Sequence, residues 1–241
     1  MEMILETNNL TKKYGKKFAI DKISIKINKG EIYALVGKNG AGKTTLMKLI
    51  TGLIKPTEGN LSLWRSGFQS EFPYQYSKNV GSLIENAGLM LNMSGYDNIK
   101  MKCICFGIND SNYIWNLLKM VSLENEGRKI VKKYSLGMKQ RLGIALALVG
   151  DPDLLVLDEP TNGLDPDGIA FMRRLMVDLN KDGKTIIISS HVLDELSKFS
   201  TRYGFINQGS MIKEISKKEL ETVCDSKNIS IEDYYFSLIN N

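Results

Sequence analysis

Apolar and polar positions follow three different patterns along the chain. Residues 3–10 and 18–28 alternate between the two, which predicts half-buried antiparallel strands. Residues 32–36 and 154–157 are continuous apolar runs, typical of parallel strands buried on both faces. Between about residues 86 and 150 the chain is predicted to be helical. We expect an α/β fold with a parallel core sheet, an N-terminal antiparallel β subdomain and a helical subdomain inserted between core strands.

The domain boundaries follow from these patterns. A single α/β domain is expected over residues 1–215, with the helical subdomain at about 86–150, followed by a short helical tail over 216–241. Residues 65–79 have no pattern and are expected to form a loop. Further expected elements are a strand over 60–64, helices over 96–106, 113–120, 138–149 and 167–180, a strand from Thr185, a strand over 202–206 and two short helices after about 215.

Composition limits where the protein works. The chain has 241 residues, 43% hydrophobic and 24% charged, as expected for one globular domain. Its longest strongly apolar stretch, residues 142–150, is far shorter than the roughly 20 residues that span a bilayer. Residues 1–4 lack the basic start of a signal peptide. We therefore expect a cytosolic chain whose membrane passage, if any, belongs to a partner. The net charge of +5 suits an anionic membrane surface as easily as nucleic acid and decides little; no nucleic acid is expected as a partner.

A glycine-rich segment predicts a phosphate site. Residues 37–44 fit the pattern G-x-x-x-x-G-K-[ST], in which glycines let backbone N–H groups turn inward around phosphates. Lys43 can reach the β- and γ-phosphates, and the Thr44 hydroxyl can ligate Mg²⁺. An apolar run before the segment and a helical segment after it supply the required strand and helix. The expected nucleotide contacts are Gly37, Lys38, Asn39, Gly40, Ala41, Gly42, Lys43, Thr44 and Thr45.

Two adjacent carboxylates predict hydrolysis. Asp158 and Glu159 end the apolar run 154–157, and ligands of open α/β sheets lie beyond the carboxyl ends of the strands. Asp158 is therefore expected to face the phosphate loop and to hold Mg²⁺, directly or through water. Glu159 can polarise the attacking water as a general base. The alternative, a strand end with solvated charges, is disfavoured beside a phosphate loop.

In this order the motifs resemble those of the nucleotide-binding subunit of ABC (ATP-binding cassette) transporters, over residues 4 to about 215. The resemblance implies a P-loop NTPase fold of the ABC cassette type that binds and hydrolyses ATP with Mg²⁺. Tyr14 resembles the aromatic residue that stacks on adenine. Asp165, after Leu164, matches the D-loop, and His191 matches the switch histidine that contacts the γ-phosphate.

A second segment is similar to the family's L-S-G-G-Q signature. It runs from Ser135 to Gln140, with Tyr134 in place of the leading leucine, Leu136 in place of the first glycine, and two residues lengthening the end. It precedes a helix whose N-terminus can bind an anion, although a serine N-cap is a compatible structural role. The resemblance implies contacts to the ATP of a partner subunit in a head-to-tail dimer, here a homodimer. The residues involved are Ser135, Leu136, Gly137 and Gln140.

Glu85 departs from the family pattern. Most members have a glutamine here that senses Mg²⁺ and couples to the membrane subunit, whereas a carboxylate is a stronger metal ligand and adds negative charge. Glu85 is predicted to contact the metal and to act in coupling; the alternative is a neutral surface substitution. Residues 81–85, together with 93–98, resemble the ATPases of lantibiotic self-immunity and of bacitracin-type exporters.

The predicted function combines these resemblances. The chain is expected to be the ATPase subunit of a membrane exporter that confers self-immunity by expelling a lantibiotic or a related antimicrobial peptide. Its partners would be a polytopic permease, a second copy of the chain and, through the permease, the exported peptide, with the ATPase at the cytoplasmic face of the membrane. The alternatives are a general drug, bacitracin-type or lipid exporter and a soluble ABC ATPase that acts on ribosomes or DNA.

Overall fold

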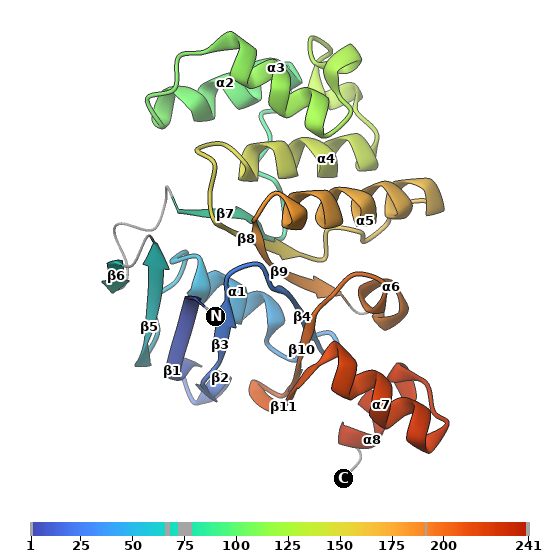
Figure 1. Ribbon diagram of the computed structural model, residues 1–241. Coiled ribbons are helices and arrows are strands. Elements are labelled where there is room, and N and C mark those ends of the chain that lie inside the picture. Colours follow the sequence, from blue (N-terminus) through green and yellow to red (C-terminus); the bar gives the residue numbers. More distant parts are fainter. Residues whose placement is uncertain (1, 66–67, 72–78, 191, 240–241) are drawn as a thin grey trace.

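The computed structural model describes residues 2–65, 68–71, 79–190 and 192–239. Its N-terminal part forms an antiparallel sheet (Figure 1). The central strand of this sheet, β1 (Met3–Tyr14), pairs with β2 (Lys17–Ile23), β3 (Lys26–Asn28) and β5 (Glu58–Arg65), and β6 (Phe68–Glu71) pairs with β5. The predicted antiparallel strands are confirmed, but β6 lies where a loop was expected.

A second, mixed sheet crosses the middle of the molecule in the order β11-β10-β4-β9-β8-β7 (Figure 1). All its described strands are parallel except β11, which returns antiparallel along β10. The parallel core sheet is thus confirmed, whereas β7 and β11 were not expected from the sequence. The strands are β4 (Ile32–Val36), β7 (Val80–Leu83), β8 (Leu154–Asp158), β9 (Thr185–Ser190), β10 (Arg202–Asn207) and β11 (Ser210–Ser216).

The apolar runs form strands because both faces of this sheet are buried. In β4, Ala34 faces the core shared with the helical insert, and Leu35 faces the core shared with the antiparallel sheet. Helix α1 (Lys43–Ile50) lies in the second core, where its Leu46 and Leu49 are fully buried. Apolar side chains therefore hold the helix that follows the phosphate loop against both sheets.

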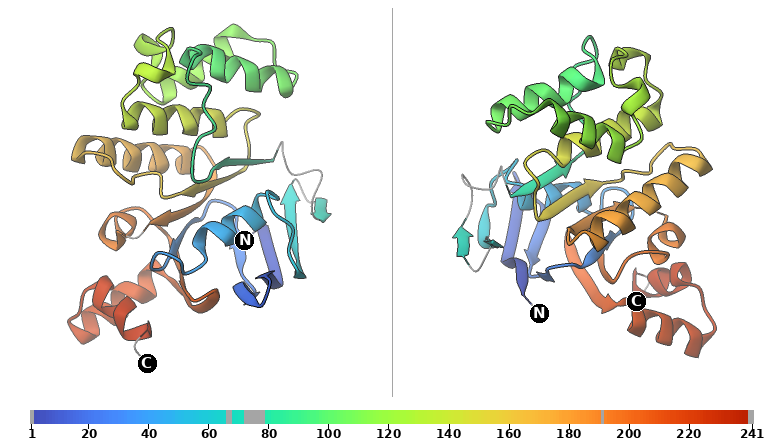
Figure 2. Two further views of the ribbon diagram at one scale, coloured as in Figure 1. Left: turned by 180° about the vertical axis from the view of Figure 1, so that it is seen from behind. Right: turned by 45° about the horizontal axis from the view of Figure 1, so that its top comes forward.

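The helical insert covers one end of the mixed sheet, and the C-terminal helices lie at the other end, as the views in Figure 2 show. Helix α4 begins at Leu136, two residues earlier than predicted, because the Ser135 side chain accepts a hydrogen bond from the Met138 N–H and caps the first turn. No described helix has the length and apolar character required to cross a membrane. The helices of this part are α2 (Gly95–Cys105), α3 (Ser111–Met120), α4 (Leu136–Ala147) and, following β8, α5 (Pro166–Lys181).

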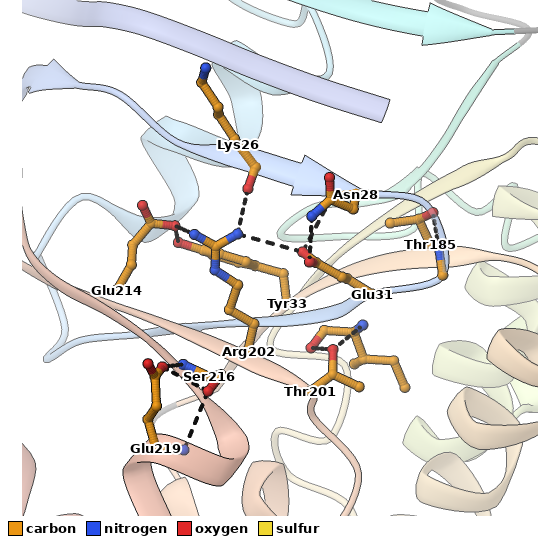
Figure 3. A network of polar contacts seen from close by, with 12 residues as sticks. Lys26, Asn28, Glu31, Tyr33, Thr185, Thr201, Arg202, Glu214, Ser216 and Glu219 are labelled. Carbon is orange, nitrogen blue, oxygen red and sulfur yellow. Dashed lines mark hydrogen bonds and ion pairs between the residues drawn. The ribbon is translucent and has the colours of Figure 1, made fainter. Parts of the chain in front are cut away.

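A partly buried polar network ties the strands around β4 together (Figure 3). The Arg202 guanidinium donates to the Lys26 carbonyl oxygen at 2.8 Å and pairs with the Glu214 carboxylate at 3.2 Å. The Tyr33 hydroxyl donates to the same carboxylate at 2.9 Å. Burial raises the pKa of Glu214, and it raises the pKa of Tyr33 well above its ordinary value. The network joins β3, β4, β10 and β11, so side-chain contacts add to the sheet pairing of the strand that leads into the phosphate loop.

The tail consists of α7 (Lys217–Lys227) and α8 (Ile231–Ile239), so the two predicted helices are confirmed. A serine begins each helix and pairs with an acidic residue three positions later. The Ser230 hydroxyl, for example, accepts from the Asp233 N–H at 3.0 Å, and hydrogen bonds from Ser230 lower the pKa of Asp233. A short helix that was not expected, α6 (Leu193–Ser197), precedes β10 and packs against α8.

Candidate functional site

The phosphate loop connects β4 to α1. Gly42 occupies the N-cap of α1 with φ +112°, and no side chain caps the helix. A Cβ atom at Gly42 would lie 2.7 Å from the Ala19 carbonyl oxygen, so only glycine fits this backbone and this space. Because no side chain caps the first turn, its N–H groups and the positive end of the helix can receive an anion.

Lys43 is the cation of this loop. Its side chain is only 5% exposed, and its ammonium donates to the Gly37 carbonyl oxygen at 2.7 Å and to the Lys38 carbonyl oxygen at 3.3 Å. The Glu159 carboxylate lies 3.5 Å from the same nitrogen. The Lys43 ammonium therefore lies among loop carbonyl oxygens and beside the Glu159 carboxylate, its one ion pair in the described part of the chain. From this position it can reach bound phosphates.

Three oxygen-bearing side chains meet at the ends of β8 and β9. The Thr44 hydroxyl donates to Asp158 Oδ2 at 2.7 Å, and the Ser189 hydroxyl donates to Asp158 Oδ1 at 2.6 Å. The Glu159 N–H donates to the Ser189 oxygen at 2.9 Å, and Glu159 has a φ of +47°, a left-handed conformation that functional sites often retain. Ser189 was missed by sequence reasoning; its signal is a polar residue ending the apolar run of β9.

This donor set fits Mg²⁺. A hydroxyl and a carboxylate oxygen are the hard ligands that this ion takes when substrate phosphates supply the others. The described residues contain no group of three or more His, Cys, Asp and Glu side chains that could hold a metal ion by themselves. Thr44 and Asp158 are thus arranged for a metal that arrives with a nucleotide.

A cleft of about 730 Å³ opens in front of the loop. It brings together Tyr14, Lys43 and Glu159, which come from three distant parts of the chain. The Tyr14 ring is 55% exposed and free to stack on a base, with the Lys12 ammonium 5.2 Å from the ring centre. Sequence reasoning missed Lys17, Phe18, Ala19, Gln208 and Gly209, whereas the predicted residues Tyr14, Asn39, Gly40, Gly42, Lys43, Thr44, Thr45 and Glu159 all line the cleft.

The signature segment lies in a different place. Ser135, Leu136 and Gly137 line a separate hollow of about 470 Å³, together with Asp165. Asp165 is the N-cap of α5, where its side chain accepts from the Gly168 N–H at 2.9 Å. None of these residues lines the cleft that contains Lys43. The two predicted anion-binding helix starts, those of α1 and α4, therefore lie at separate sites of the same chain.

Glu85 and Gln140 also lie outside the cleft. The Glu85 carboxylate is 2.7 Å from the Lys48 ammonium of α1 and is not in contact with Thr44 or Asp158 in the described interactions. Both Glu85 and Gln140 line a groove of about 330 Å³ with Leu136 and Lys139, and Gln140 is not among the residues that line the hollow of Ser135. The metal contact of Glu85 stays a prediction. His191 lies outside the described residues.

Comparison with known proteins gives the following matches. Residues 20–162 match the family model described as ABC transporter. The bacitracin transport ATP-binding protein of Enterococcus faecalis is 43% identical over 221 residues, covering 91% of this chain and 71% of the relative. The lantibiotic transport ATP-binding protein of Streptococcus pyogenes is 44% identical over 212 residues, covering 88% of this chain and 90% of the relative.

Solved structures agree on the fold. The ATP-binding subunit of an ABC transporter is 25% identical with a TM-score of 0.85, covering 98% of this chain and 99% of the other. A dimeric ATP-binding cassette in a post-hydrolysis state, bound to ADP and Pi, is 24% identical with a TM-score of 0.79, covering 89% of this chain and 99% of the other. Together with the predicted sheets, these matches confirm the α/β cassette fold.

Proposed function

Because the chain belongs to the ABC transporter family, and therefore binds and hydrolyses ATP, we propose that it is the ATPase subunit of a membrane exporter that expels a lantibiotic or a related antimicrobial peptide. The observation that carries this proposal is the identity of 43% and 44% to proteins named for bacitracin transport and for lantibiotic transport. Both names refer to peptide antibiotics. Expelling such a peptide would protect the cell that carries the exporter.

Different residues of the cleft act on different parts of ATP. Backbone N–H groups of the phosphate loop and the Lys43 ammonium bind the phosphates, and Tyr14 offers its ring to the base. Thr44 and Asp158 would hold Mg²⁺, which supplies positive charge against the phosphates when bound. The Glu159 carboxylate accepts the proton of the attacking water while the γ-phosphate separates from ADP. His191 is proposed to donate a hydrogen bond to the γ-phosphate, on the family resemblance alone.

The separate hollow of Ser135 and Gly137 supports a dimer. A helix start that is exposed and away from its own chain's cleft can complete the cleft of a second copy in a head-to-tail pair. One of the solved neighbours is a dimeric cassette bound to ADP and Pi. We therefore place Ser135, Leu136, Gly137 and Asp165 at the contact between two copies.

The groove around Glu85 is proposed to receive a polytopic permease at the cytoplasmic face of the membrane. Leu91 lines this groove and is 46% exposed, which offers apolar surface to a partner helix. Glu85 lines the same groove and is tied to α1 through Lys48. A partner seated in the groove could therefore act on the helix that follows the phosphate loop.

A bacitracin-type exporter is the second candidate. The relative named for bacitracin transport favours it, and it shares the ATPase chemistry and the permease but differs in the peptide. A drug or lipid exporter has no such support among the relatives described above. The substrate test must therefore separate the two kinds of peptide.

Protection of cells tests the proposal. Sensitive cells that express the chain with its permease are expected to tolerate more of a lantibiotic, and unchanged sensitivity to bacitracin and to an unrelated lipophilic drug would assign the peptide class. Glu159→Gln is expected to lower ATP turnover at least about a hundredfold while ATP binding is kept, because the general base is lost. Cells that carry Glu159→Gln should therefore lose the protection against the peptide. Equal protection by the wild type and Glu159→Gln would contradict a transport role driven by this site.

A further inference from the structure

The C-terminal tail touches the phosphate loop. The Tyr235 hydroxyl oxygen on α8 accepts a hydrogen bond from the Lys38 backbone N–H at 2.9 Å. Lys38 is the second residue of the loop, 197 positions earlier in the chain. The Lys38 ammonium also lies 5.5 Å from the centre of the Phe236 ring. Two adjacent aromatic residues of the last helix therefore hold the entry to the loop.

The Tyr235 side chain is fixed by its surroundings. It is 5% exposed, and its ring stacks on Phe205 of β10 with a centroid distance of 5.8 Å and an angle of 23° between the planes. Phe205 pairs with Val36, the last residue of β4, across the mixed sheet. The stacking on Phe205 thus positions the Tyr235 hydroxyl at the end of β4, where the phosphate loop begins.

The peptide that Tyr235 holds is connected to the catalytic cation. The Lys38 carbonyl oxygen accepts from the Ala41 N–H at 3.0 Å and from the Lys43 ammonium at 3.3 Å. Lys38 is therefore anchored through its N–H by the tail and through its carbonyl by the turn of the loop. Losing the tail contact would leave an N–H without its partner and one side of this turn unsupported.

From these contacts we infer that Tyr235 is a positioning residue for ATP binding: the tail holds the phosphate loop in its anion-accepting shape before the nucleotide arrives. The inference rests on the loop as the phosphate site. Preorganised groups bind more tightly because the ordering is complete before binding. Tyr235 itself does not line the nucleotide cleft, so its effect reaches ATP through the Lys38 peptide.

Tyr235→Phe tests this role with the ring kept. The expected result is a Kd and a KM for Mg-ATP about fivefold higher, the size of one hydrogen bond, with kcat changed less than about twofold. Tyr234→Phe is the matched control, because Tyr234 is 7% exposed and packs edge-on against Phe205, but its hydroxyl makes no hydrogen bond to the described part of the loop. It should leave Kd unchanged.

One more variant separates the possible results. Lys43→Ala should weaken ATP binding at least about tenfold if the loop is the phosphate site, which tests the site itself. Equal Kd values for Tyr235→Phe and Tyr234→Phe, with Lys43→Ala impaired, would overturn the positioning role. Normal binding by Lys43→Ala would instead overturn the assignment of the loop.

Discussion

The N-termini of α1 and α4 have the same backbone dipole, but they differ in how they are capped. Helix α1 begins at a glycine with no capping side chain, and its first residue is the buried Lys43. Helix α4 begins at Ser135, whose own hydroxyl accepts the Met138 N–H at 3.2 Å. The first start has no side-chain cap and can receive an anion within the chain, whereas the second is already capped by its own serine. The same structural feature can therefore serve as a resident binding site or as a surface offered to a partner.

The surroundings of the two glycines show the same contrast. A Cβ atom at Gly42 would lie 2.7 Å from a backbone oxygen of β2, whereas a Cβ atom at Gly137 would meet Leu164 Cδ2 at 3.6 Å and Ser135 Oγ at 4.0 Å, both ordinary contacts. Gly137 also lacks the positive φ of Gly42. The α1 start is enclosed and the α4 start is open.

The largest effect is expected from matched glycine substitutions. Gly42→Ala should lower the free energy of unfolding by about 1–3 kcal/mol, because alanine is strained at this φ and meets backbone, and ATP affinity should fall with it. Gly137→Ala should leave both quantities within about 0.5 kcal/mol of the wild type in the isolated subunit. Urea unfolding and calorimetry measure the pair. Equal losses in the two variants would end the distinction between an enclosed and an open helix start.

A smaller effect is expected at Ser135. Ser135→Ala should lower the free energy of unfolding by about 1 kcal/mol through the lost cap, and it should not change ATP affinity of the isolated subunit. ATP turnover of the dimer should fall, because the partner's cleft loses a contact. Ser135→Asn keeps a capping side chain and serves as the control for stability. A loss of ATP affinity in the isolated subunit would place Ser135 at its own chain's nucleotide.

The smallest effect on the isolated subunit is expected at Glu85, which pairs with Lys48 of α1 and shares a groove with Leu136 of α4. Its pair with Lys48 of α1 is largely exposed, so Glu85→Ala and Lys48→Gln should each change stability by less than about 1 kcal/mol and leave ATP affinity near normal. In cells with the permease, Glu85→Ala should reduce protection against the peptide, and Glu85→Gln should be milder because an amide oxygen remains. Full protection by the alanine variant would make Glu85 an ordinary surface residue.

The features that could be predicted from the sequence are those encoded by residues close together in the chain. The loop from Gly37 to Thr44, the pair Asp158 and Glu159 and the apolar run of β4 each lie within a few residues, and the structure brings the predicted loop and acidic residues together. The edge strand β11 was missed because only Ile215 among its residues is buried, so its pattern resembles that of a loop.

Contacts between distant segments were also missed. Two examples are the ion pair of Lys48 with Glu85 and the hydrogen bond from the Lys38 N–H to the Tyr235 hydroxyl. Both depend on which elements pack together, and no spacing in the sequence predicts them. Gln140 shows the same limit on one helix. It is the last residue of the signature segment, but it lines the groove of Glu85, whereas Ser135 and Gly137 line the separate hollow.

The position of β4 in the mixed sheet has a consequence for the order of events during synthesis. The antiparallel sheet pairs segments from residues 3–65 and can form early on a growing chain. Strand β4 emerges in the same period, but both of its neighbours, β9 and β10, come from residues 185–207. On the ribosome the strand that leads into the phosphate loop stays without partners until most of the chain has been made. We therefore expect the phosphate loop to take its anion-accepting shape late in synthesis, once residues 185–207 can pair with β4.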